Sequence, residues 1–267
     1  MTNKHGDFIW YELMTTDADA ATAFYEKVVG WSVANPGHEP GGDGFDYREI
    51  KASEGLVGGM MALSGDMVQH GARPGWIGYV AVDDVDKMVE SIEHGGGKVL
   101  MPAHDLENVG RFAMVADPQG AAFYVMKPVP PADNPDMSSN AFAAERPMDG
   151  HCAWNELATS DPVAALHFYG QRFGWVKDGE MDMGPMGTYS FIRHGAVIGA
   201  VMPKPPHVPV AGWTYYFRVP EIDAAAATIE ANGGQVVHGP VEIPGGEYSM
   251  NAIDPQGAHF ALVGKRG

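Results

Sequence analysis

Two glutamates occupy the same place in two copies of one sequence pattern. Glu12 lies in the stretch WYELMTTD and Glu156 in WNELATSD, and a tryptophan, Trp10 or Trp154, stands two residues before each of them. Alternating bulky and polar residues predict two β-strands, on which each glutamate shares a face with its tryptophan. A carboxylate beside an indole is partly desolvated, which raises its pKa unless an arginine or a backbone N–H answers it. Glu12 and Glu156 are therefore candidate general bases, or anchors for a cationic or hydroxylated ligand.

A structural role for the two glutamates is the alternative. Each could pair with Arg48, Arg218 or a backbone N–H, because buried charges are usually paired. Arg218 shares a predicted strand face with Thr214 and Tyr216. This placement leads to the hypothesis that Arg218 meets Glu156 across a cleft, and an exposed strand arginine is the other interpretation.

The histidines and the cysteine give weaker signals. His259 is predicted to share the face of Ala261 on the last strand, but a metal site usually needs three or four ligands, so a core or rim residue is the alternative to a ligand-binding one. His151 and Cys152 are adjacent, which places them on opposite faces of a strand and argues against a Cys–His nucleophile.

Both glutamates belong to a duplication that covers nearly the whole chain. Residues 10–31 return as residues 154–175 at an offset of 144 positions, and the pentapeptide DPQGA at 117–121 returns at 254–258 at an offset of 137. Internal repeats of this kind decide the fold and are settled first. The sequence therefore describes two copies of one domain.

Each copy contains two units with the same order of elements. In the first unit a strand over 8–15 leads to an Asp17 cap, a helix over 18–29 that ends at Gly30, a loop over 36–44 and further strands. A second strand and helix begin at Trp76, and three strands follow. Four βαβββ units result, which predicts an α+β fold with a domain over 1–126, a Pro- and Ser-rich linker over 127–150 and a domain over 151–267.

Composition narrows the function. The formal net charge of −17 argues against nucleic acid and against anionic membrane surfaces as partners. A single cysteine excludes an intrachain disulfide, and the sequence MTNKHGDFIW has no apolar core of signal-peptide length. We expect a cytoplasmic protein that is a monomer or a homodimer and takes a small-molecule ligand.

The elements together resemble the vicinal oxygen chelate superfamily, which includes glyoxalase I, bleomycin-resistance proteins, fosfomycin-resistance enzymes and extradiol dioxygenases. The resemblance is carried by a strand ending in T-x-D, an A-x-x-FY-x-x-x-x-GW helix and its exit, a V-D-D-V-D helix start and a D-P-x-G hairpin before the last strand. It implies that the four units pair into two domains, each a curved mixed sheet that encloses a cleft, with the helices outside. Within the superfamily the chain is most similar to tandem two-domain glyoxalase-like proteins.

The resemblance also implies where a metal would bind. Enzymes of this superfamily hold a divalent metal with His, Gln or Glu on the first strand, at the opening of the second unit and on the last strand. The matching positions of the two domains hold Trp10, Ile77 and Tyr124, and Trp154, Thr214 and Ala261. None of these side chains supplies an imidazole or a carboxylate. We therefore expect no metal cofactor, with a divalent metal at displaced ligands as the alternative.

Three functions remain open. The first is a metal-independent protein that binds a small organic molecule in aromatic, acid-lined clefts. The second is a glyoxalase-like lyase or isomerase, or a dioxygenase, and the third is an interaction module. For the first, Glu12 and Glu156 would supply the polar anchors. The predicted ligand-binding residues are Trp10, Tyr79, Tyr124, Trp154, Thr214, Tyr216, Arg218 and His259.

Overall fold

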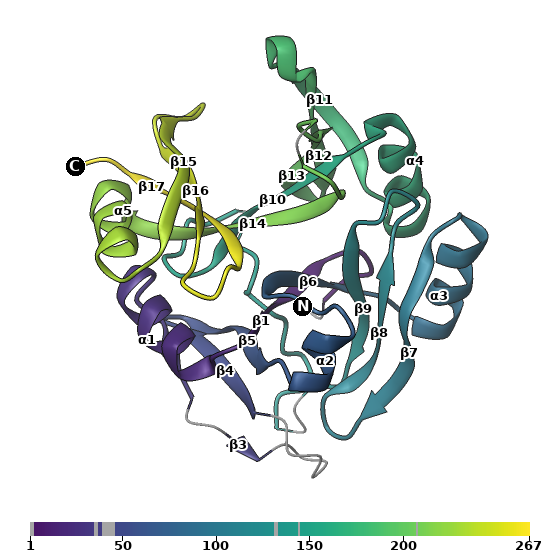
Figure 1. The fold of residues 1–267 in the computed structure, drawn as a ribbon. Helices are drawn as coiled ribbons and strands as arrows, with labels where there is room; N and C mark the ends of the chain where they lie inside the picture. The colour runs from purple at the N-terminus through teal and green to yellow at the C-terminus, as the bar shows by residue number, and fades with distance from the viewer. Residues whose placement is uncertain (1–2, 35–36, 39–45, 131–132, 144, 207) are drawn as a thin grey trace. The chain divides into compact units, whose positions relative to one another are not determined.

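A computed structural model of the chain describes residues 3–34, 37–38, 46–130, 133–143, 145–206 and 208–267 (Figure 1). The loop predicted over 36–44 lies almost entirely outside these residues. No helix in the described ranges is long and apolar enough to cross a bilayer.

The first repeat contains two βαβββ units, as predicted. Its first unit has β1 (Phe8–Thr15), α1 (Ala18–Val28), β2 (Ser32–Val33), β3 (Gly37–His38), β4 (Asp46–Ala52) and β5 (Gly55–Ala62). A short helix that was not predicted, α2 (Gly65–Gln69), leads to the second unit. That unit has β6 (Gly75–Ala81), α3 (Val85–His94), β7 (Lys98–Leu106), β8 (Gly110–Ala116) and β9 (Ala122–Pro128).

The second repeat follows the same plan. Its first unit, the third βαβββ unit of the chain, has β10 (Cys152–Thr159), α4 (Pro162–Phe173), β11 (Val176–Asp182), a 3₁₀ turn over Gly184–Met186, β12 (Thr188–His194) and β13 (Ala196–Pro203). The fourth unit has β14 (Gly212–Glu221), α5 (Ile222–Ala231), β15 (Gln235–Glu242), β16 (Tyr248–Ile253) and β17 (His259–Lys265). The predicted α+β fold of four βαβββ units is confirmed.

Each repeat forms one mixed sheet. The strand orders are β2-β4-β5-β1-β6-β9-β8-β7 and β11-β12-β13-β10-β14-β17-β16-β15, with β3 paired to β4. In every unit the first strand is parallel to the last strand, as in β1 with β5 and β14 with β17. A parallel pair needs a long crossover, which the helix of each unit provides.

The helices begin at the caps that the sequence predicts. The Asp17 carboxylate accepts a hydrogen bond from the Ala20 N–H at 2.9 Å, and the Asp161 carboxylate accepts one from the Ala164 N–H at 3.0 Å. These side chains satisfy N–H groups that the first helical turn leaves without partners. Helix α4 ends at Gly174, whose φ of 69° favours glycine.

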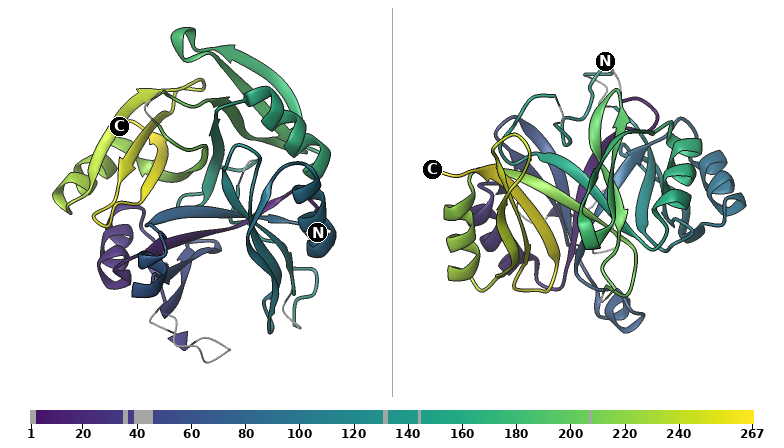
Figure 2. Two further views of the ribbon diagram at one scale, coloured as in Figure 1. Left: turned by 45° about the vertical axis from the view of Figure 1, so that its right-hand side comes forward. Right: turned by 90° about the horizontal axis from the view of Figure 1, so that it is seen from above.

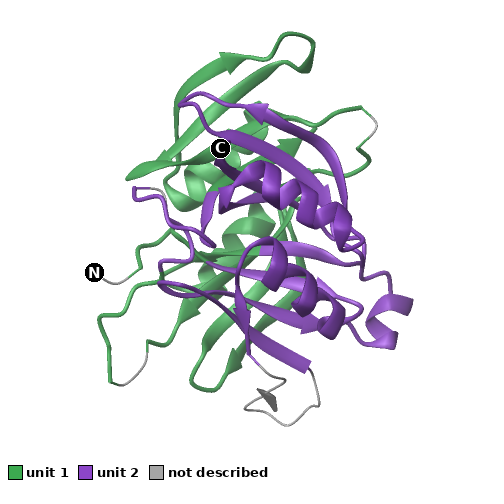
Figure 3. Ribbon diagram, turned by 90° about the vertical axis from the view of Figure 1, so that its left-hand side faces the viewer, with its two compact units in different colours: residues 1–9, 78–139, 154–213 green, residues 10–77, 140–153, 214–267 purple. Residues whose placement is uncertain are grey.

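The chain folds into two compact units, which we call unit 1 and unit 2 and which are not the βαβββ units of the sequence repeat. Each takes part of its residues from both repeats (Figure 3). Unit 1 contains residues 1–9, 78–139 and 154–213, and unit 2 contains residues 10–77, 140–153 and 214–267. In unit 1, α3 and α4 lie side by side, and in unit 2, α1 and α5 do so (Figures 1 and 2). Within each unit, therefore, a helix of one repeat packs against a helix of the other.

A buried aspartate joins the two repeats inside unit 1. Asp117 begins the D-P-Q-G turn, where its carboxylate accepts hydrogen bonds from the backbone N–H groups of Gln119 and Ala121, both at 2.9 Å. The hydroxyl of Tyr169, from α4 of the second repeat, donates to the same carboxylate at 3.1 Å and accepts from Trp213 Nε1 at 3.2 Å. Burial raises the pKa of Asp117.

The equivalent residues form the same network inside unit 2. Tyr25 in α1 donates to Asp254 at 3.1 Å and accepts from Trp76 Nε1 at 3.0 Å. Burial raises the pKa of Asp254 as well, and burial raises that of Tyr25 well above its usual value. The repeated Tyr, Trp and Asp residues are thus the polar centres of the two cores, and both tyrosines are buried.

Candidate functional site

In unit 1, one predicted carboxylate lies in a chain of hydrogen bonds. Trp154 and Glu156 stand two residues apart on β10, and Tyr189 comes from β12. Trp154 Nε1 donates to the Tyr189 hydroxyl at 2.8 Å, and that hydroxyl donates to Glu156 Oε2 at 2.6 Å. A hydrogen bond to a carboxylate is among the stronger ones in proteins. The tyrosine therefore fixes one oxygen of Glu156 beside the indole.

Unit 2 has a matching arrangement on β1 and β4. Trp10 Nε1 donates to the Tyr47 hydroxyl at 3.0 Å. Glu12, two residues after Trp10, is only 4% exposed, whereas Glu156 is half-buried. Glu12 is paired in register with Gly59 of β5, and a Cβ at Gly59 would lie 2.0 Å from the Tyr47 hydroxyl. Glycine at this position thus allows the phenol to lie against the strand beside Glu12.

Sequence reasoning missed the two tyrosines. Tyr47 lies in DYREI and Tyr189 in TYSFI, so a shared Y-x-x-I pattern on the strand before the last of each unit was the available signal. The pattern is short, and the partner tryptophan lies on another strand. The missed residues are the ones that connect Trp154 to Glu156.

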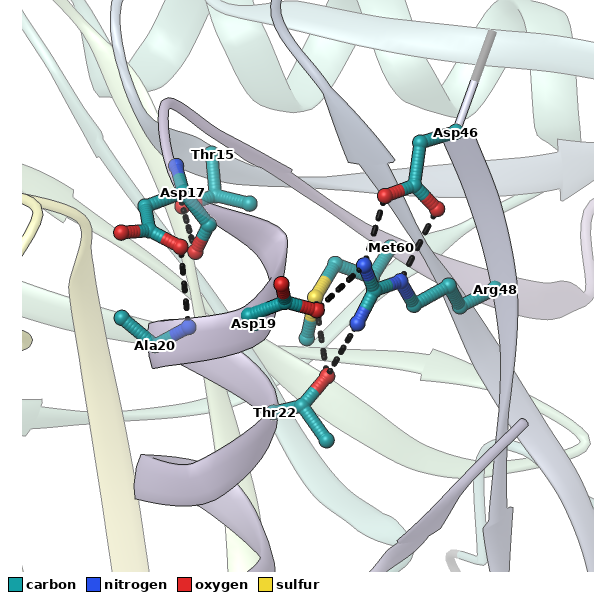
Figure 4. Close-up of polar contacts among 8 residues, drawn as sticks. All are labelled: Thr15, Asp17, Asp19, Ala20, Thr22, Asp46, Arg48 and Met60. Carbon is teal, nitrogen blue, oxygen red and sulfur yellow. Dashed lines mark hydrogen bonds and ion pairs between the residues drawn. The ribbon is translucent and has the colours of Figure 1, made fainter. Parts of the chain in front are cut away.

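Arg48 follows Tyr47 on β4, and adjacent residues of a strand point to opposite faces. Figure 4 shows the Arg48 side chain between Asp46 and helix α1. Its guanidinium binds Asp46 through two hydrogen bonds, at 2.9 and 2.6 Å, and also contacts Asp19 of α1 at 2.7 Å. A further hydrogen bond, at 3.3 Å, joins Arg48 to Thr22 of α1. The pKa of Arg48 is raised by these partners and that of Asp46 is lowered. Arg48 thus connects β4 to α1, whereas in the sequence it was one of the alternative partners of Glu12 and Glu156.

Arg218 also binds an acid that was not predicted. The guanidinium makes two hydrogen bonds with the Glu247 carboxylate, one of them between Nη2 and Oε2 at 3.0 Å. This contact holds the pKa of Glu247 below its usual value. The Arg218 side chain is 12% exposed, so the exposed strand arginine is excluded, and its carboxylate partner within unit 2 is Glu247.

The predicted aromatic residues of the first repeat form a stack in unit 1. Tyr79 on β6 and Tyr124 on β9 are paired in register, and their ring centroids lie 4.2 Å apart with an interplanar angle of 15°. The ring of Phe112 on β8 packs against that of Tyr124, with 6.0 Å between the centroids, and against that of His104, with 4.1 Å between the centroids. Both tyrosines are buried.

The remaining predicted residues lie in unit 2. Thr214, Tyr216 and Arg218 occupy alternate positions of β14, and Tyr216 is paired in register with Ala261 of β17. Thr214 is half-buried and Tyr216 is buried. His259 is exposed at the first position of β17.

The side chains at the metal positions of the family do not fit a divalent metal. On the last strands these positions hold the phenol of Tyr124, stacked on Tyr79, and the methyl group of buried Ala261. On the first strands they hold the indoles of Trp10 and Trp154, whose Nε1 groups donate hydrogen bonds to tyrosines. None is the imidazole or carboxylate that Zn, Mn or Fe binds.

Comparison with known proteins identifies relatives over the whole length. The family model described as "Glyoxalase/Bleomycin resistance protein/Dioxygenase superfamily" matches residues 8–125 and 150–262. "Putative glyoxylase CFP32" of Mycobacterium bovis is 36% identical over 97% of this chain and 95% of its own length. "Anthracycline biosynthesis protein DnrV" of Streptomyces peucetius is 29% identical over 95% of this chain and 91% of its own length.

Solved structures show the same fold at low identity. The Mn(II)-bound glyoxalase from Novosphingobium aromaticivorans is 17% identical, with a TM-score of 0.62 over 100% of this chain and 84% of that one. Such an identity supports the fold, and function must be argued from the site.

Proposed function

This chain belongs to the Glyoxalase/Bleomycin resistance protein/Dioxygenase superfamily, and we propose that within it the chain binds a small organic molecule without the metal of the family enzymes. Glu12 and Glu156 serve as polar anchors, and the aromatic residues beside them supply apolar contact area. A cationic aromatic compound suits a carboxylate next to an indole, because the ring attracts the cation as well.

The observation that carries this proposal is the duplicated Trp–Tyr–Glu arrangement. In unit 1 the carboxylate, the phenol and the indole form one hydrogen-bonded chain, and in unit 2 the same residue types stand at the equivalent positions. A carboxylate held in a fixed orientation binds a ligand with less loss of side-chain entropy. This favours a recognition site over a simple structural ion pair.

The relatives are compatible with small-molecule chemistry of more than one kind. One carries the name of a glyoxylase and another that of an anthracycline biosynthesis protein. The Mn(II)-bound glyoxalase structure supports an alternative, a metal-dependent lyase, isomerase or dioxygenase that uses displaced ligands. The donor types at the family positions support the metal-independent function instead.

Calorimetric titration with 2-phenylethylamine and tryptamine, two cationic aromatics, tests the proposal. Glu156→Gln and Glu12→Gln should each weaken binding at their own site about tenfold, since hydrogen bonds to charged groups are worth about 1.5–3 kcal/mol. Glu93→Gln, at an exposed position of α3, makes the same charge change away from both sites and should have no effect. Equal affinities in all variants would refute the carboxylate anchors.

A further inference from the structure

The two repeats carry different side chains on one face of equivalent strands, namely β6, β9 and β8 in the first repeat and β14, β17 and β16 in the second. The positions compared are related by the offset of 137, which pairs Tyr79 with Tyr216 and Tyr124 with Ala261. In both repeats these two residues are also register partners on neighbouring parallel strands. The comparison is therefore one of equivalent places in two copies of one structure.

In the first repeat this face is aromatic and uncharged. Tyr124 stacks on Tyr79, and the β8 residue opposite Tyr124 is Met114. Phe112, which lies on β8 with Met114, also packs against Tyr124. The remaining position on β6, two residues after Tyr79, is Ala81. A polar group of a ligand would find no charged side chain at these positions.

In the second repeat the same positions are small and polar. Ala261 replaces the Tyr124 ring, and the β16 residue opposite Ala261 is Asn251. Ser249 stands where the first repeat has Phe112, and Arg218 stands where it has Ala81. Both Ser249 and Asn251 are half-buried, and within the described part of the chain their side chains make no hydrogen bond to other residues.

Arg218 brings a hydrogen-bond donor that lacks a partner. Glu247 binds the two terminal nitrogens of its guanidinium, whereas the Nε–H group is buried without an acceptor in the described residues. Buried polar groups are nearly always hydrogen-bonded, so an isolated one calls for an explanation. Because Glu247 already neutralises the guanidinium, the acceptor that fits best is an uncharged oxygen.

We propose that Arg218, Asn251 and Ser249 form a recognition site of the second repeat for a carbonyl or hydroxyl oxygen of an organic ligand. Arg218 Nε donates to that oxygen, and the equivalent face of the first repeat, filled by the Tyr79–Tyr124 stack, does not bind it. The proposal rests on the proposed function in one respect, namely that the chain binds small organic molecules. It does not involve Glu12 or Glu156.

The test compares two uncharged probes that differ in one oxygen. Saturation-transfer NMR titrations with acetophenone and ethylbenzene should show acetophenone binding about fivefold more tightly, the value of one net hydrogen bond. Arg218→Lys keeps a positive charge for Glu247 but loses Nε–H, so the preference for acetophenone should fall below twofold. Arg111→Lys makes the same replacement at a half-buried arginine of unit 1 that is paired with Asp86 and Asp105, and it should leave the preference intact.

A second variant guards against a folding defect in the first. Asn251→Met introduces the residue that the first repeat carries at this place, and it should also reduce the preference for acetophenone. An equal affinity for both probes in the unmodified protein, or a preference that survives both variants, would overturn the proposal. Those results would leave the amine titrations of Glu12 and Glu156 variants unaffected, so the two failures can be told apart.

Discussion

Replacing Tyr169 with phenylalanine should destabilise unit 1 by removing one oxygen atom. In the native protein this hydroxyl donates to Asp117 at 3.1 Å and accepts from Trp213 Nε1 at 3.2 Å, and the tyrosine is 2% exposed. Losing a hydrogen bond to a charged group costs about 1.5–3 kcal/mol, and leaving the indole N–H without an acceptor adds about 1 kcal/mol or more. We expect a loss of about 3 kcal/mol.

The assay is thermal and chemical unfolding of the full chain, followed by tryptophan fluorescence. A loss of about 3 kcal/mol corresponds to a decrease in Tm of roughly 6–12 °C for a folding unit of this size. The decrease should appear in the transition of unit 1, because Asp117 and Trp213, which this hydroxyl contacts, both belong to that unit. Tyr25→Phe should have the same effect in unit 2.

The control is Tyr248→Phe, which removes the hydroxyl of a half-buried tyrosine whose ring lies under Arg266 at 4.2 Å. It should change Tm by no more than about 1–2 °C, as is usual for changes near the surface. If Tyr169→Phe were as stable as the unmodified protein to within about 0.5 kcal/mol, the buried tyrosine–aspartate contact would not be a source of stability, and the reasoning would be refuted.

Three further predictions concern the buried charges and the site. Burial raises the pKa of Asp117, so its contribution to stability is fully present below its unfolded pKa, near 3.8, and is lost as the pH rises through the higher folded value. Urea unfolding at several pH values should therefore show the stability of Asp117→Asn rising relative to that of the unmodified protein as the pH increases from 3.8. A difference in stability that does not change with pH would contradict this. Arg48→Met should lower the free energy of unfolding in urea by about 2 kcal/mol, because Asp46, one third of whose side chain is exposed, loses its cation. The same variant should not change the affinity for amines, since Arg48 lies on the face of β4 opposite Tyr47. A weakened affinity would place Arg48 in the binding site. Tyr189→Phe should weaken the binding of 2-phenylethylamine about threefold in calorimetry, which is less than the effect of Glu156→Gln. The variant loses one hydrogen bond that orients the Glu156 carboxylate but keeps its charge. An effect equal to that of Glu156→Gln would make the Tyr189 hydroxyl itself the anchor.

The sequence predicts the order of elements well because helix caps, glycine stops and strand alternation are local signals. Asp17 caps the helix that it was expected to cap, and Asp161 does the same at the equivalent position of the second repeat. Tyr25, Trp76 and Asp254 each have an identical residue at the equivalent position of the other repeat, which the sequence shows. It could not show that the tyrosine of one repeat binds the aspartate of the other, because the spacing of residues within one repeat is the same whichever repeat supplies the partner.

The candidate site was predicted in part for the same reason. Strand parity places Trp154 and Glu156 on one face, and the hydrogen bonds through Tyr189 agree with that placement. Parity says nothing about which side chain a neighbouring strand brings to that face. Tyr189 and Glu247 were therefore missed, and the acids that bind Arg48 and Arg218, Asp46 and Glu247, were not among the partners named from the sequence.

The central claim is that the chain binds its ligand without a metal, and the metal dependence of binding tests it most directly. Protein dialysed against a chelator would be titrated with 2-phenylethylamine, alone and after addition of stoichiometric Zn²⁺, Mn²⁺, Ni²⁺ or Fe²⁺, with the metal content measured by mass spectrometry before dialysis. We predict less than one metal ion per ten chains and dissociation constants within about twofold of one another. One tightly held ion per repeat, with binding that disappears on its removal, would contradict the claim and favour the metal-dependent enzyme.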